Sequence, residues 1–121
     1  MEISSLNPMI VSSVSEIIVT LFQEMGFEKR HRLTVAEVGN TVDIRMEHPD
    51  GFCADVAQVD AVPRDMTCIR VNVENFDEAY TMLTANGFQC MRKAGPIENE
   101  YAKCVNMMAP SGYIITLVQL N

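Results

Sequence analysis

Cysteine and histidine are the side chains of this sequence best suited to bind a metal or carry out redox chemistry, and their spacing restricts both. The four cysteines are separated by 15, 22 and 14 residues, and only two histidines could join them. These six residues are Cys53, Cys68, Cys90, Cys104, His31 and His48. No two cysteines form the CxxC spacing that zinc-finger and thioredoxin sites use. We therefore exclude these two kinds of site and expect four reduced thiols.

Length and composition restrict the class of protein. The chain has 121 residues, of which 48% are hydrophobic and 21% charged, as is typical of one folded domain. A net charge of −7 disfavours contact with the phosphate backbone of a nucleic acid. No apolar run is long enough to span a membrane, and the start at Met1-Glu2 lacks the cationic and apolar segments of a signal peptide. We expect a cytoplasmic protein that binds neither nucleic acid nor membrane.

The two halves of the sequence match at an offset of 61 positions, as from Gln58 to Gln119. Met25-Gly26-Phe27 aligns with Asn86-Gly87-Phe88, and Pro49-Asp50-Gly51-Phe52 aligns with Pro110-Ser111-Gly112-Tyr113. The matches lie at turns, where backbone geometry restricts the residue type. The sequence therefore predicts an internal duplication: one domain, 1–121, built from two modules at about 5–60 and 66–120.

Each half has the pattern of a strand, a helix and three further strands. The strands are expected at 7–12, 28–35, 41–47 and 52–59, and again at 66–73, 89–93, 101–108 and 113–120. Capping boxes at Ser13-x-x-Glu16 and Asn75-x-x-Glu78 are expected to begin the helices, which end at Gly26 and Gly87. With these ends, the first helix has one more residue between its cap and its glycine than the second helix has. The correspondence between the two halves is therefore uncertain by one position before the helices.

Apolar residues follow both capping boxes at helical spacing. In the first helix they are Ile17, Ile18, Leu21, Phe22 and Met25; in the second, Ala79, Met82 and Leu83 form the expected buried stripe. We therefore predict an α+β fold in which two tandem βαβββ modules form a curved eight-stranded sheet with the helices on its outer face.

Two βαβββ modules in a chain of this length resemble the vicinal oxygen chelate superfamily, which includes glyoxalase I, the bleomycin-resistance proteins and the extradiol dioxygenases. The resemblance covers nearly the whole chain and is most specific at 23–27, 84–88 and 110–117, the last similar to a closing D-P-x-G-x-x-x-E-[LF] stretch. The family shares its scaffold across many activities, so no single reaction follows.

In metal-dependent members, the resemblance implies four ligand positions. They lie early in the first strand of each module and four residues after the turn glycine of each last strand. Here they correspond to Asn7 (or Leu6), Asp55, Cys68 and Thr116. The family pattern is His or Gln with Glu, whereas only Asp55 is a carboxylate here and none is an imidazole. A Lewis-acid metal needs about three firm protein donors, so we expect neither a catalytic metal nor another cofactor.

Strand alternation predicts which side chains face away from the helices. The expected ligand-binding residues are Asp55, Cys68, Arg70, Asn72, Cys53, Asn106, Met108 and Thr116. Cys104 shares the face of Asn106. Apolar, sulfur and amide groups with a few charges are typical of small-molecule sites. No catalytic residue is assigned.

Several of these residues have alternative interpretations. Asp55 either contacts a ligand or is paired with Arg70 or Arg45, because an isolated buried charge is costly. Cys68 is either a thiolate activated by Arg70 or, as we favour, a passive buried thiol. A soft-metal site of Asp55 with Cys53, Cys68 and Cys104 is the least favoured. The segment 95–101 is either a lid or an ordinary surface loop.

The leading functional hypothesis is a small-molecule-binding protein of the glyoxalase and bleomycin-resistance type, with its ligand in the concave sheet and no metal. The acidic balance of the chain favours a cationic ligand. The alternative is a glyoxalase-like lyase or isomerase that uses Asp55 and a metal completed across a dimer. A third is a structural or regulatory module whose cavity is filled by its own side chains. Exposed sheet edges favour a homodimer.

Overall fold

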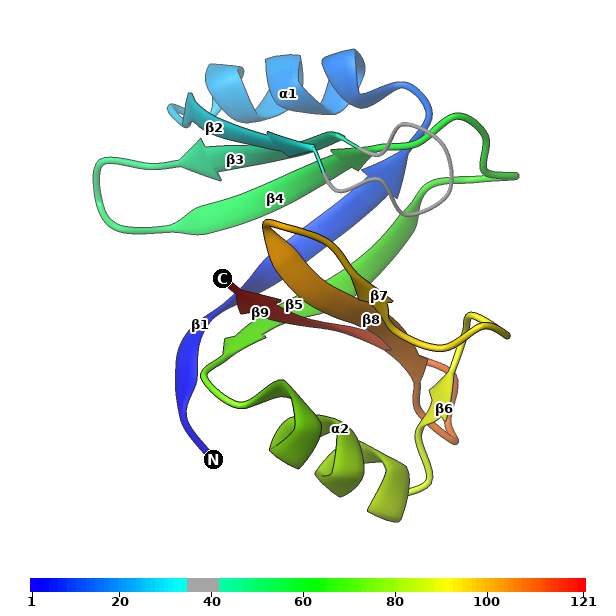
Figure 1. Ribbon diagram of the computed structural model, residues 1–121. Helices are drawn as coiled ribbons and strands as arrows, with labels where there is room; N and C mark the ends of the chain where they lie inside the picture. The colour runs from blue at the N-terminus through cyan, green and yellow to red at the C-terminus, as the bar shows by residue number, and fades with distance from the viewer. Residues whose placement is uncertain (35–41) are drawn as a thin grey trace. The chain divides into compact units, whose positions relative to one another are not determined.

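The computed structural model describes residues 1–34 and 42–121, which form two compact units (Figure 1). The N-terminal unit is Asn7–Thr67, and the C-terminal unit joins Cys68–Asn121 with Met1–Leu6. Both units contain one helix packed on antiparallel and parallel strands, so the predicted α+β class is confirmed. Val35 and Thr41, which we expected to belong to strands, lie outside the described residues. No helix in the described part is long and apolar enough to cross a membrane.

The N-terminal unit contains the second part of β1 (Ile3–Ser12), helix α1 (Ser15–Glu24), and strands β2 (Glu28–Thr34), β3 (Val42–Glu47) and β4 (Cys53–Gln58). Strands β2, β3 and β4 are antiparallel neighbours, while β1 runs parallel to β4 with Met9 beside Asp55. One face of these strands packs on α1 through a buried apolar cluster of Ile18, Val19, Ile44, Met46 and Val56. The other face is free to carry polar side chains.

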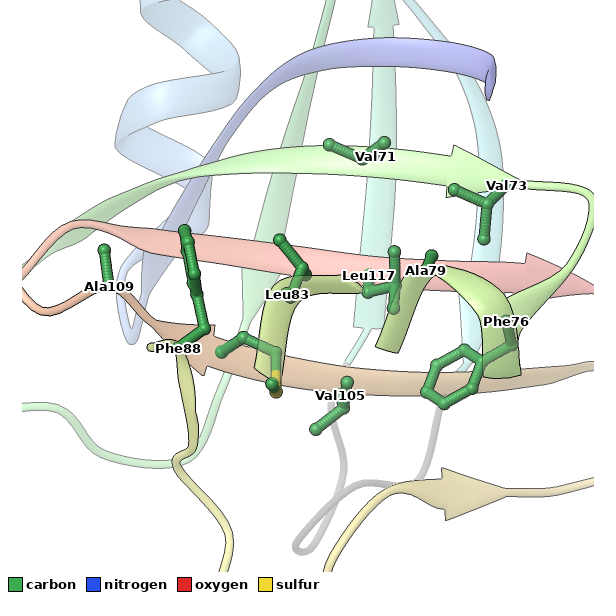
Figure 2. Close-up of a cluster of buried hydrophobic side chains, with 10 residues drawn as sticks. Val71, Val73, Phe76, Ala79, Leu83, Phe88, Val105, Ala109 and Leu117 are labelled. Atoms are coloured by element: carbon green, nitrogen blue, oxygen red, sulfur yellow. The ribbon is translucent and has the colours of Figure 1, made fainter. Parts of the chain in front are cut away.

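The C-terminal unit contains β5 (Met66–Val73, from Cys68 onward), α2 (Phe76–Ala85), β6 (Gln89–Cys90), β7 (Ile97–Glu98), β8 (Ala102–Met108) and β9 (Ile114–Leu120). Strand β5 is parallel to β9, and β9 is antiparallel to β8. The start of the chain joins this unit, since the Glu74 amide donates to the Glu2 carbonyl. Figure 2 shows Phe76, Ala79 and Leu83 of α2 packed against the valines of the strands and Leu117.

The described part contains nine strands rather than the expected eight, because the segment between α2 and β8 folds differently from its counterpart. Only Gln89 and Cys90 of the expected strand 89–93 pair with β8. Further along, β7 forms a hairpin with β8, placing Ile97 beside Cys104. The segment that we considered as a lid is therefore partly tied to the sheet by backbone hydrogen bonds.

At the start of each helix, the side chain of a glutamine from the last strand of the same unit accepts a hydrogen bond from a backbone amide. Gln58 Oε1 accepts a hydrogen bond of 2.9 Å from the Ser15 amide, and Gln119 Oε1 accepts one of 2.6 Å from the Phe76 amide. These acceptors satisfy amide groups that have no partner within the helix. The two glutamines are 61 positions apart, and so are the two amides, so the same contact occurs in both units.

The capping box expected at Ser13 is wrong. The residue before α1 is Val14, which provides no side-chain cap, whereas its counterpart Asn75 accepts a hydrogen bond from the Glu78 amide. Helices α1 and α2 nevertheless have equal lengths, and their first residues are equivalent positions of the two halves. The uncertainty of one residue disappears, because it arose from the incorrect choice of Ser13.

Removing the glutamine acceptors should destabilise the protein. We expect Gln58→Ala to lower the free energy of unfolding by about 1–3 kcal/mol, since it leaves buried backbone groups without partners. Its Nε2 also donates to the Ser13 and Val59 carbonyls, so the loss should exceed that for Gln119→Ala. Urea unfolding would measure both. Exposed Gln23 in α1 is the control, and a loss for Gln23→Ala as large as that for Gln58→Ala would contradict this role.

Fewer apolar helix residues are buried than the apolar pattern of the sequence predicted. In α1, Ile18 and Val19 are buried, whereas Ile17, Leu21 and Met25 are all more than half exposed. The expected buried stripe of α2 is correct at Ala79 and Leu83 but wrong at Met82, which is 40% exposed. Helical periodicity places residues on a common side, but the strands decide how wide a stripe they cover.

Candidate functional site

In the N-terminal unit, Asp55 is bound by two side chains from neighbouring strands. Arg45 Nε donates to Asp55 Oδ1 at 2.8 Å, and Asn7 Nδ2 donates to Asp55 Oδ2 at 3.0 Å. The register of β3 with β4 places Arg45 directly beside Asp55. Asp55 is fully buried, as are most of its neighbours on β4, so these bonds compensate the cost of removing its charge from water.

The ion pair also affects Arg45. Burial opposes the charge on this guanidinium, but the hydrogen bond and the negative charge of Asp55 outweigh burial and raise the pKa of Arg45 above its ordinary value. The pairing of Asp55 with Arg45, one of the interpretations proposed from the sequence, is present in the structure. Arg45 and Asn7 were not among the expected ligand-binding residues. The equivalence of Arg45 with Asn106 in the repeat was the available signal.

In the C-terminal unit, Thr116 lies at the centre of an equivalent arrangement. Its hydroxyl is 2.7 Å from Asn106 Oδ1 and 3.4 Å from Cys68 Sγ. The register places Thr116 of β9 between Arg70 of β5 and Asn106 of β8. Arg70 Nε donates to Asn72 Oδ1 at 3.0 Å. Five of the expected residues therefore lie together on one face of this unit, opposite α2.

The two arrangements correspond residue by residue at the offset of 61 positions. Asp55 matches Thr116, Arg45 matches Asn106, and Asn7 matches Cys68. In each unit the residue of the last strand contacts one side chain from the preceding strand and one from the first strand. The contacts are thus repeated although all three residue types differ.

The remaining expected residues are placed less uniformly. Cys53 begins β4, is half-buried, and lies beside Glu47 of β3. Cys104 is buried on β8, beside Val118 of β9. Met108 is 38% exposed at the end of β8. Arg70 is buried, and this burial lowers the pKa of its guanidinium, although the negative charge of a Cys104 thiolate would raise it.

Comparison with solved structures reveals the fold. Methylmalonyl-CoA epimerase from Mycobacterium tuberculosis is similar with a TM-score of 0.72 and 10% identity, over 97% of this chain and 88% of that one. A glyoxalase/bleomycin resistance protein/dioxygenase superfamily member from Vibrio splendidus gives a TM-score of 0.61 and 15% identity, over 98% and 99%. The chain has the vicinal oxygen chelate fold. The resemblance seen in the sequence is therefore confirmed at the level of fold.

The same fold occurs in longer chains. A mutant of glyoxalase I from Zea mays matches with a TM-score of 0.68 and 14% identity, over 98% of this chain but only 44% of that one. No protein-family profile matches the sequence, and no curated protein sequence matches it. The vicinal oxygen chelate fold is thus shown by structure alone.

The residues at the four implied metal positions of the vicinal oxygen chelate fold do not suit a catalytic metal. In the N-terminal unit, both oxygens of Asp55 accept hydrogen bonds from Arg45 or Asn7, so a cation would have to displace an arginine. In the C-terminal unit the two positions supply a neutral hydroxyl, which is a weak metal ligand, and a single thiol, so they offer only one firm donor. Across the described residues, no three His, Cys, Asp or Glu side chains form a group that could hold a metal.

Proposed function

We propose that the chain binds a small organic molecule, without a metal, on the sheet faces opposite the helices. The observation that carries the proposal is the polar centre of each face: Asp55 with its partners, and Thr116 with its partners. A sheet face that served only as core would favour apolar side chains, because each buried polar group has a desolvation cost. A few oriented polar groups among apolar neighbours are typical of small-molecule sites.

The side chains themselves offer little excess negative charge to a ligand. The Asp55 carboxylate is paired with Arg45, and the Cys68, Asn106 and Thr116 positions are uncharged in their usual states. The expectation of a cationic ligand came from the negative net charge of the whole chain, and the residues at the centres of these two faces do not share that excess of negative charge. We therefore propose a ligand recognised through hydrogen bonds, with amide, carbonyl or carboxylate groups.

A thermal-shift screen followed by calorimetry would test this proposal. The panel would contain acyl thioesters, glutathione conjugates, small carboxylic acids and cationic aromatic compounds. A ligand present at about 100 times its Kd stabilises the folded state by about 2.7 kcal/mol, enough to raise the Tm by several degrees. If no compound in the panel raises the Tm, the proposal is contradicted.

Thr116→Val should weaken binding of the identified ligand by about tenfold. The variant keeps the shape of the side chain but removes the hydroxyl beside Asn106 and Cys68. Calorimetric titration would measure the Kd of each variant. The matched control is Thr84→Val, an exposed position at the outer side of α2. Equal Kd values for the two variants would exclude the face around Thr116 as the binding surface.

A metal-dependent lyase or isomerase is the second candidate, because an epimerase and glyoxalase I share the fold. In this function Asp55 would have to leave Arg45, and further metal ligands would come from a second copy of the chain. Elemental analysis of the untreated protein distinguishes the candidates. One equivalent of Ni, Zn, Mn or Fe per chain, lost in Asp55→Asn, would favour the lyase or isomerase over the metal-free binder.

A further inference from the structure

Helix α1 carries a row of exposed apolar side chains that the core of its unit does not use. Val14, Ile17, Leu21 and Met25 are 51%, 69%, 52% and 51% exposed. They are three or four residues apart, so they form one stripe along the helix and its two end positions. We name these four residues the α1 ridge.

The C-terminal unit shows that the fold does not require this ridge. The equivalent positions, 61 residues further along the chain, are mostly polar: Asn75, Glu78, Met82 and Asn86. Helix α2 has the same length as α1 and packs on its own strands. Since a mostly polar stripe is compatible with the same architecture, the apolar stripe of α1 needs an explanation other than folding.

Two glutamates border the ridge, and Lys29 lines a second hollow together with Glu16 and Ile17. A hollow of about 500 Å³ beside it is lined by Glu16, Ile17, Thr20, Leu21 and Glu24. The two glutamates are the only charged residues of α1 and are separated by eight positions, which corresponds to about 12 Å along a helix. An apolar stripe with an acidic border is complementary to a helix whose apolar stripe is bordered by lysine or arginine.

We propose that the α1 ridge docks a basic amphipathic helix of another protein. The apolar residues of the partner would cover Ile17 and Leu21, and its cationic side chains would lie near Glu16 and Glu24. A second copy of this chain suits the surface less well, because neither α1 nor α2 contains a basic residue. Packing α1 against α1 would bring glutamates together, and like charges oppose association.

Fluorescence anisotropy would test the proposal with a labelled amphipathic peptide of about 18 residues made of leucine and lysine. The comparison peptide replaces every lysine by glutamate. We expect saturable binding of the basic peptide to the full chain at about 0.15 M salt, and at least about tenfold weaker binding of the acidic one. Equal affinity for the two peptides would overturn the proposal.

Substitutions separate docking from unspecific attraction. Ile17→Glu introduces the residue type found at the equivalent position of α2, and Met82→Glu adds the same charge to α2. A purely electrostatic contact would be strengthened by either change. If the peptide docks on the ridge, Ile17→Glu should weaken binding of the basic peptide at least about tenfold, while Met82→Glu should change its Kd by less than about twofold. Leu21→Ser provides a second, uncharged variant.

Two further outcomes would overturn the proposal. The first is a similar Kd for Ile17→Glu, Leu21→Ser and the unsubstituted chain, with an unchanged Tm showing that all are folded. The second is a dimer, detected by light scattering, that Ile17→Glu converts into a monomer, because the ridge would then be occupied by a second copy of the chain.

Discussion

Asp55→Asn is expected to lower the free energy of unfolding by about 3 kcal/mol, measured by urea unfolding near pH 7. The substitution keeps the shape of the side chain but removes the charge that Arg45 and Asn7 bind. Arg45 would then remain beside a neutral, fully buried group, and removing one member of a buried ion pair commonly costs about 3–5 kcal/mol. We expect the lower end of this range, because the Arg45 side chain is still 24% exposed and can turn toward water.

The matched control is Asp50→Asn, whose side chain is 75% exposed at the turn before β4. Its effect should stay within about 0.5 kcal/mol. Combining Asp55→Asn with Arg45→Gln should restore part of the lost stability, since the double variant no longer leaves the Arg45 charge beside a neutral group. If the two single effects simply add, the pair does not stabilise the fold in the way the geometry indicates.

Met107→Ala is expected to lower the free energy of unfolding by about 2–5 kcal/mol. Met107 is completely buried in the cluster between α2 and its strands, where Figure 2 shows Leu83, Val105 and Phe88. Truncation removes apolar contacts and leaves a cavity that the surrounding β8 and α2 can fill only in part. A domain of this size has only about 5–15 kcal/mol of stability, so this change alone should be clearly visible in the urea midpoint.

The neighbouring residue offers a direct control. Met108 lies on the opposite face of β8 and is 38% exposed, so Met108→Ala should cost less than about 1.5 kcal/mol. Met46, the counterpart of Met107 in the N-terminal unit, is also fully buried, and Met46→Ala should resemble Met107→Ala. A loss for Met108→Ala as large as that for Met107→Ala would show that the two faces of β8 are wrongly assigned.

The helices show what sequence patterns can and cannot predict. Gly26 and Gly87 mark the two helix ends correctly, because each has a positive φ, 98° and 87°, that favours glycine whatever packs around it. The start of α1 was predicted wrongly at Ser13, since the group that satisfies its amides is Gln58 on a distant strand. A local pattern contains no information about an acceptor supplied 43 residues later.

Part of the arrangement of side chains on the strands was predicted from their alternation. Alternation along β5 placed Cys68, Arg70 and Asn72 on the face away from the helices, and on that face Arg70 Nε donates to Asn72 Oδ1. The contact of Asp55 with Arg45 could not be predicted from alternation alone, because it depends on which strand is adjacent and in which register. The antiparallel pairing of β3 with β4 supplies that information for Arg45.

The sequence by itself indicated the order of both helices and of eight of the nine strands in the described part, the turns at the glycines, the equivalence of the two halves and the absence of histidine from the four implied metal positions. These features depend on residue type and on periodicity along a few neighbouring positions. Only the tertiary structure decided that glutamines from β4 and β9 start the helices, that Arg45 and Asn7 bind Asp55, and that the ridge of α1 stays exposed. Each of these depends on strands and helices distant in the chain meeting in a definite register, and this is a property of the packed molecule.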